Sequence, residues 1–167
     1  MTTYLDWKDK KLDGKTYDVV IIGAGIAGLT AAIYAKRAHK SVIVLEEKTH
    51  GGQIIQTFGI ANWPGEISIS GVDLMNNVHE QVKSLRANFD YVDVNKIEKD
   101  GDEYTVWSDE FWYKGKTVII AVGSNEKKLE VLGEDKFVSR GVSYCATCDG
   151  GFYHDKTVAV VGGGNTA

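Results

Sequence analysis

The chain has 167 residues, enough for one domain and part of another, and its composition, 43% apolar and 25% charged, is typical of a globular protein. Its formal net charge of −4 leaves no basic footprint for nucleic acid, and no apolar run reaches the ~18 residues of a membrane span. We therefore predict neither a nucleic-acid nor a membrane partner. The first residues contain no apolar signal sequence, which predicts a cytoplasmic protein.

The segment from residue 17 to residue 47 predicts a strand, a helix and a second strand. The apolar run YDVVIIG (17–23) is typical of a strand buried on both faces. GAGIAGLTAAIYAKRA (23–38) follows with apolar residues at helical spacing, and SVIVLEE (41–47) is a second apolar run. Together they predict a right-handed βαβ unit with a parallel sheet.

The turn between this strand and helix carries a G-x-G-x-x-G motif. Its first glycine permits the turn, the second lets a pyrophosphate approach the backbone, and the third allows close helix–strand packing. Glu46 ends the second strand, where its carboxylate could accept hydrogen bonds from a ribose. The alternatives are a tight turn without a ligand and a solvated strand end. The candidate dinucleotide-binding residues here are Gly23, Gly25, Ile26, Ala27, Gly28, Glu46 and Glu47.

The middle of the chain predicts a loop, a helix and further strands. Residues 49–70 lack periodicity, and the Ser70–Asp73 segment resembles a capping box that opens a helix with one apolar stripe. Segments 89–94 and 103–108 alternate like strands around a turn at Asp100–Gly101. Residues 117–123 form another apolar run, which predicts a buried strand.

Residues 156–167 repeat the pattern of the first strand and glycine turn. Their G-x-G-x-x-A motif predicts a second dinucleotide site, and two such motifs indicate electron transfer between two dinucleotides. The alternative is a degenerate or unused second site. The pattern stops one turn into the predicted helix, so we expect a piece of a longer protein. The candidate residues of this site are Gly162, Gly164, Asn165, Thr166 and Ala167.

The two cysteines of the chain, Cys145 and Cys148, form a C-x-x-C pair followed by Asp149. Such a pair can be half of a zinc site, a haem attachment site or a redox dithiol. Haem attachment needs a histidine at position 149, and zinc needs two more ligands, which the scattered histidines do not supply at a common spacing. A redox dithiol fits best, with Asp149 either moving a proton or capping a helix. Two buried, unreactive cysteines are the alternative.

These motifs together resemble the low-molecular-weight thioredoxin reductases. The similarity runs from about Tyr17 onward and includes GGQI (51–54), NWPG (62–65), IIAVG (119–123), CATCDG (145–150) and VAVVGGGNTA (158–167). It implies that Cys148 faces a flavin, that Cys145 attacks the disulfide of thioredoxin, and that Asp149 is the acid–base group. It also implies FAD along the first glycine motif, bordered by Gly51, Gly52, Gln53, Asn62, Ala121 and Gly123.

The implied fold is a three-layer, Rossmann-like α/β FAD-binding domain at residues 1–126, with a small β-meander over 89–113. The truncated start of a second Rossmann-like nucleotide domain follows at 127–167. The implied activity is reduction of thioredoxin with electrons from NADPH, through FAD, in a homodimer. The alternatives are ferredoxin as donor, a peroxidase or glutaredoxin-like partner, and a non-catalytic FAD-binding fragment. Val122 departs from the family pattern, and the residues expected to bind the NADPH phosphate would lie beyond Ala167.

Overall fold

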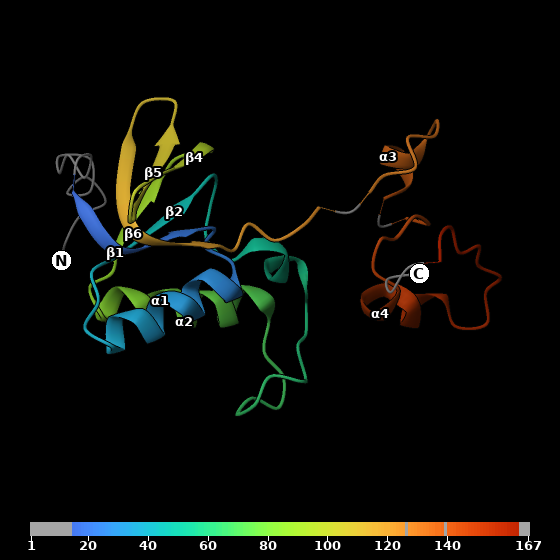
Figure 1. Cartoon of the computed structure of the whole chain (residues 1–167). Coiled ribbons are helices and arrows are strands. Elements are labelled where there is room, and N and C mark those ends of the chain that lie inside the picture. The colour runs from blue at the N-terminus through green and yellow to red at the C-terminus, as the bar shows by residue number, and fades with distance from the viewer. Residues whose placement is uncertain (1–14, 126, 139, 164–167) are drawn as a thin grey trace. The chain divides into compact units, whose positions relative to one another are not determined.

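The computed structural model describes residues 15–125, 127–138 and 140–163. It divides into two compact units, Met1–Gly123 and Ser124–Ala167. In the first unit, one sheet has the strand order β3-β2-β1-β6-β5-β4 (Figure 1). Among the described residues, no helix is both long and apolar enough to cross a membrane. The elements of this unit are β1 (Thr16–Ile22), α1 (Ile26–Arg37), β2 (Val42–Glu46), the 3-10 helix η2 (Gly52–Gln56), α2 (Gly71–Ser84), β3 (Asn88–Tyr91), β4 (Val94–Asp100), β5 (Glu103–Ser108) and β6 (Trp112–Ile120).

The parallel half of the sheet contains the predicted βαβ unit. β1 pairs with β2 on one side and with β6 on the other, and β3 extends the sheet beyond β2. Helices α1 and α2 cover one face of these strands (Figure 1). Leu29 and Ala32 of α1 and Met75 and Val82 of α2 are fully buried there in one apolar cluster. Burial of this side-chain area, at about 25 cal/mol per Å², is the main force that fixes the helices on the sheet.

Helix α2 begins where the capping box predicted it. The Ser70 hydroxyl oxygen accepts a hydrogen bond from the backbone N–H of Asp73 at 3.0 Å, and its O–H donates to the Asp73 carboxylate at 2.6 Å. The cap satisfies one of the N–H groups that have no partner within the helix. The apolar stripe of α2 is buried at Leu74, Met75, Val78 and Val82, and Leu85 is the C-cap residue.

The antiparallel half forms the layer on the opposite face. β4, β5 and the first half of β6 make the meander, and Val106 and Tyr113 from it are buried against Tyr17 and Val20 of β1. β6 belongs to both halves, since its later residues pair in parallel with β1. A Cβ at Gly115 would lie 2.6 Å from the Cγ2 atom of Val20, so glycine permits the close approach of β6 to β1.

One sequence-based boundary is wrong. The expected strand at 89–94 is divided: β3 joins the parallel sheet beside β2, and β4 begins at Val94 in the meander. Phe89 is buried in the helix-side cluster, which holds β3 in the parallel layer. The meander therefore comprises residues 94–115 and excludes β3.

The second unit contains two short helices, α3 (Glu134–Phe137) and α4 (Ala146–Asp149), and the 3-10 helix η3 (Gly150–Tyr153). The strand expected from residue 156 is not formed in the described residues 156–163, where Val158, Val160 and Val161 are exposed. A strand needs a hydrogen-bonded neighbour, and the described part of this unit offers none.

Candidate functional site

β1, β6 and α1 come into close contact at the first glycine turn. Gly23 has a φ of +104°, and a Cβ there would lie 2.3 Å from the carbonyl oxygen of Ala121. A Cβ at Gly28 would lie 1.9 Å from the carbonyl oxygen of Gly23. Both glycines are therefore required for packing. At Gly25, by contrast, no described atom lies within 4 Å of a Cβ position, so the middle of the motif faces open space.

This open space lies at the N-terminus of α1. Gly25 is the N-cap residue and has no side chain to bond the first N–H groups of the helix. The first turn contains no acidic residue, so the positive end of the helix dipole is not neutralised locally. Free backbone N–H groups beside open space are suited to a phosphate or pyrophosphate.

Glu46, at the end of β2, contacts the same turn. Its Oε2 atom accepts a hydrogen bond from the backbone N–H of Ala24 at 2.7 Å, and Oε1 accepts one from the N–H of Lys48 at 3.2 Å. The carboxylate thus lies against the glycine turn, where a ribose next to a bound pyrophosphate could reach it. Glu47 is exposed, and its carboxylate pairs with the Nζ atom of Lys48 at 3.1 Å.

A second glycine loop lies beside the first. The N–H of Gly51 donates to the carbonyl oxygen of Ala24 at 2.8 Å, and a Cβ at Gly52 would lie 3.4 Å from the Cα atom of Gly25. Both Gly51 and Gly52 have positive φ angles, of +114° and +58°, and Gln53 follows in η2. The structure therefore brings residues 23–28, 46 and 51–53 together.

The three remaining candidate residues are Ala121, Gly123 and Asn62, and they differ in how close they lie to the glycine turn. Ala121 lies against Gly23, and its N–H donates to the carbonyl oxygen of Ile22 at 2.8 Å. Gly123 follows with a φ of +72° in open surroundings. Asn62 is exposed in the loop closed by the Ile60–Ile69 bridge.

The second unit carries the C-x-x-C pair at the start of α4. Cys145 is disulfide-bonded, and Cys148 is the one other cysteine in the sequence. The side chain of Cys148 lies outside the described part of the structure. Ser143 links the pair to the acid: its O–H donates to the Oδ2 atom of Asp149 at 2.7 Å, and its oxygen accepts from the N–H of Cys145 at 3.1 Å.

Glu134 organises the segment that precedes the C-x-x-C pair. This carboxylate is buried, with 5% of its surface exposed. It accepts hydrogen bonds from the N–H groups of Leu129 at 2.9 Å and Glu130 at 2.6 Å and from the hydroxyl of Tyr144. The Tyr144 hydrogen bond, followed by those from the backbone, lowers the pKa of Glu134 below its usual value. The residue next to Cys145 is thus fixed to α3.

A family model for pyridine nucleotide-disulphide oxidoreductases matches residues 17–167. The chain belongs to this family. The chain is also 46% identical over 154 residues to the thioredoxin reductase of Bacillus subtilis (strain 168), a match that covers 92% of this chain and 48% of the relative. It spans about half the length of the curated relatives it matches.

Solved structures of thioredoxin reductases also match this chain. The crystal structure of thioredoxin reductase from Streptococcus pyogenes MGAS5005 matches with a TM-score of 0.74 and 46% identity, over 83% of this chain and 45% of that one. A ferredoxin-flavin thioredoxin reductase from Clostridium acetobutylicum matches with a TM-score of 0.64 and 33% identity, over 83% of this chain and 48% of that one. The predicted mixed α/β, Rossmann-like fold is thereby confirmed for this member of the oxidoreductase family.

The second dinucleotide site of this family member is described only at its first residues. Gly162 has a φ of +116°. Gly164, Asn165, Thr166 and Ala167 lie outside the described residues. The predicted pyridine-nucleotide site therefore stays a prediction.

Sequence reasoning missed a pair of stacked histidines beside the second glycine loop. The rings of His50 and His79 are nearly parallel, with centroids 3.8 Å apart, and His79 also meets Phe89 edge-on. His50 Nε2 lies 3.1 Å from Asn76 Oδ1. Burial, followed by the charges of His50 and Lys83, lowers the pKa of His79 from 6.5 to about 4. His50 directly precedes Gly51, but nothing local in the sequence signals that His79 of α2 lies against it.

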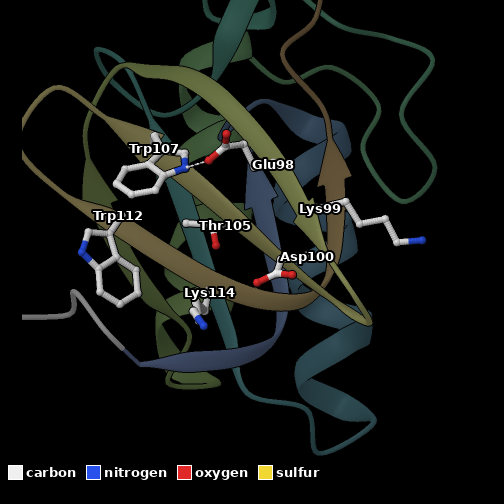
Figure 2. Close-up of a pocket in the computed structure, with 7 residues that line it drawn as sticks. All are labelled: Glu98, Lys99, Asp100, Thr105, Trp107, Trp112 and Lys114. Atoms are coloured by element: carbon white, nitrogen blue, oxygen red, sulfur yellow. Dashed lines mark hydrogen bonds between the residues drawn. The ribbon is translucent and has the colours of Figure 1, made fainter.

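A shallow pocket of about 500 Å³ lies elsewhere, on the outer face of the meander (Figure 2). It is lined by side chains of both charges and two tryptophans, and the Nε1–H of Trp107 donates to Glu98 Oε2 at 2.9 Å. It includes none of the predicted site residues. The lining residues are Glu98, Lys99, Asp100, Thr105, Trp107, Trp112 and Lys114.

Proposed function

We propose that this chain supplies the FAD-binding and redox-dithiol parts of a thioredoxin-disulfide reductase. The observation that carries the proposal is the meeting of two glycine loops at an uncapped helix N-terminus, with open space at Gly25 and a carboxylate from Glu46 alongside. This arrangement suits the diphosphate and ribose of FAD. We assign residues 1–126 to the FAD-binding domain and residues 127–167 to the start of the pyridine-nucleotide domain.

The residues that would hold FAD divide by chemistry. Backbone N–H groups of residues 25–28 would bind the diphosphate, Glu46 would accept from the ribose, and residues 51–53 would border the ring system. Glu47, Asn62, Ala121 and Gly123 are proposed at the rim. Bound FAD would supply two-electron transfer between a nicotinamide donor and a disulfide.

The protein residues perform the thiol chemistry. Two electrons enter the Cys145–Cys148 disulfide, its S–S bond breaks, and Asp149 gives a proton to one of the two sulfurs. The thiolate of Cys145 then attacks the disulfide of thioredoxin, which forms a mixed disulfide and releases one thioredoxin thiolate. Cys148 then returns its proton to the Asp149 carboxylate and attacks the Cys145 sulfur as a thiolate. The mixed disulfide bond breaks, the Cys145–Cys148 disulfide is restored, and the second thioredoxin sulfur leaves as a thiolate, which releases reduced thioredoxin.

NADPH is the proposed donor, with Gly162, Gly164, Asn165, Thr166 and Ala167 at its site. The similarity to a ferredoxin-flavin thioredoxin reductase favours ferredoxin as the second candidate. A cytoplasmic homodimer is the proposed form of the protein, and thioredoxin is its proposed partner. Comparing thioredoxin reduction with NADPH, NADH and reduced ferredoxin in the full-length protein would decide the donor.

The FAD site can be tested with two glycine variants. Gly25→Ala adds a methyl group to open space at a φ of −75°, so the fold should keep its stability while the affinity for FAD falls by about tenfold or more. Gly28→Ala forces a methyl group against the Gly23 carbonyl and should destabilise the protein itself, by about 1–3 kcal/mol or more.

The measurements are the flavin absorbance, the FAD dissociation constant and the melting temperature of the apoprotein. A colourless, folded full-length protein would contradict FAD binding. Normal FAD affinity in Gly25→Ala would show that FAD does not lie against this turn. A flavoprotein without thioredoxin reductase activity would retain the FAD site but refute the substrate.

A further inference from the structure

We propose that Ser143 is a positioning residue, which holds the Asp149 carboxylate for proton transfer at the redox cysteines. The proposal rests on the function proposed above. The Ser143 hydroxyl has one hydrogen, and it has two acceptors within reach: Asp149 Oδ2 at 2.7 Å and the Cys145 carbonyl oxygen at 3.3 Å. The contact to the Asp149 carboxyl oxygen is shorter by 0.6 Å and is the stronger one, so the hydroxyl donates to Asp149.

The same hydroxyl is also an acceptor. The backbone N–H of Cys145 donates to its oxygen at 3.1 Å, which polarises the O–H group toward the carboxylate. A chain of two hydrogen bonds therefore runs from the first redox cysteine through Ser143 to the acid. The backbone N–H of Asp149 donates to the Cys145 carbonyl at 3.0 Å and ties the residue to the turn a second time.

These contacts have different consequences for the side chain. The backbone hydrogen bond fixes the main chain of Asp149, but it leaves the carboxyl group free to rotate about its χ angles. Asp149 is partly exposed, so water would otherwise compete for the carboxylate. The Ser143 hydroxyl is thus the described contact that selects one orientation of the carboxyl group.

The orientation of the Asp149 carboxyl group matters for proton transfer during reduction of the disulfide. When two electrons break the disulfide of Cys145, one sulfur takes the proton of Asp149 and a carboxylate remains. The Ser143 hydroxyl then donates to the oxygen that carries the new charge. It stabilises the product of the step and leaves the acid in place to recover a proton when the disulfide forms again.

A double-mutant cycle in the full-length enzyme tests the proposal. Asp149→Asn should lower kcat for thioredoxin reduction by about 100-fold, the low end for a general acid–base group. Ser143→Ala should lower kcat by about tenfold with unchanged FAD content, and Ser143→Thr, which keeps the hydroxyl, should restore most of it. Because Ser143 acts through Asp149, the double variant should be no slower than Asp149→Asn alone.

Tyr144→Phe provides a matched control. It removes one hydroxyl from the neighbouring residue and breaks the bond to Glu134, without touching the described Ser143–Asp149 contact. Its effect on kcat should multiply with that of Asp149→Asn. If the Ser143→Ala effect multiplies in the same way, or if Ser143→Thr is as slow as Ser143→Ala, Ser143 only stabilises the turn and the proposal is wrong.

Thiol alkylation gives a readout that does not depend on thioredoxin. In the reduced protein, the rate of iodoacetamide reaction with the cysteines is measured across pH. Ser143→Ala should shift the midpoint of this profile, and the shift should vanish in the Asp149→Asn background. Identical profiles for Ser143→Ala and the unaltered protein would overturn the proposal. If the unaltered protein does not reduce thioredoxin, that result counts against the proposed function alone.

Discussion

Mild acid should weaken the fold through His79. Its pKa is lowered to about 4 in the folded protein, against an ordinary value of 6.5, because burial disfavours the charged ring and His50 and Lys83 repel it. Between these two values the unfolded chain binds the proton more readily. The contribution of the neutral His79 ring to the free energy of unfolding is therefore complete above pH 6.5. It decreases as the pH falls from 6.5 toward 4.

The size of the effect follows from the same values. The difference between 6.5 and about 4 corresponds to about 3.4 kcal/mol if fully expressed. His79 is partly exposed, so solvent screening reduces this figure, and we expect about 1–2 kcal/mol. Part of it should already be lost between pH 7 and pH 5, above the range in which carboxylates with lowered pKa values, such as Glu134, lose their own contribution.

Urea denaturation at pH 7, 6 and 5 measures this loss at constant FAD saturation. His79→Gln should flatten the pH dependence, since the glutamine cannot titrate. His154→Gln is the control, because the His154 side chain is 88% exposed and its removal should leave the slope unchanged. If His79→Gln loses as much stability between pH 7 and pH 5 as the unaltered protein, the stacked pair is not the source of the effect.

Four further substitutions test other parts of the structure. Ser70→Ala removes the cap of α2 and should lower the free energy of unfolding by about 1 kcal/mol in urea, with an unchanged flavin spectrum. Glu134→Gln should cost about 1–3 kcal/mol by the same measurement, because an amide cannot accept all the hydrogen bonds of the buried carboxylate; an unaffected protein would show that this network is not structural. In the full-length enzyme, Cys148→Ser should form a stable mixed disulfide with a thioredoxin that lacks its resolving cysteine, and Cys145→Ser should instead show a long-wavelength flavin absorption band. Both variants should lack turnover. If Cys145→Ser forms the mixed disulfide and Cys148→Ser shows the absorption band, the roles of the two cysteines are reversed.

Features set by neighbouring residues were predictable from the sequence. The glycine turn at 23–28 and the Ser70 cap depend on residues a few positions apart, and both are found where expected. The division of segment 89–94 was not predictable. Its side chains alternate in the same way throughout, but β3 pairs with β2 whereas β4 pairs with β5. The stacking of His50 on His79 depends on how α2 lies beside a loop from β2, which no local pattern reveals. The Ser143–Asp149 contact is local, but the spacing alone does not say which way either side chain turns.

The position of β6 in the sheet has a consequence for synthesis of the protein. β1 is the central strand of the parallel layer, yet its partner on one side begins at Trp112: Thr16 pairs with Lys114, and Asp18 forms an ion pair with Lys116. At a translation rate of about 5–20 residues per second, the intervening segment takes about 5–20 s to emerge from the ribosome. During that time one edge of β1 has no strand beside it. An unpaired edge on an apolar strand promotes aggregation. Nascent chains stalled before residue 112 should therefore depend on chaperones, and that dependence should drop once β6 has left the exit tunnel.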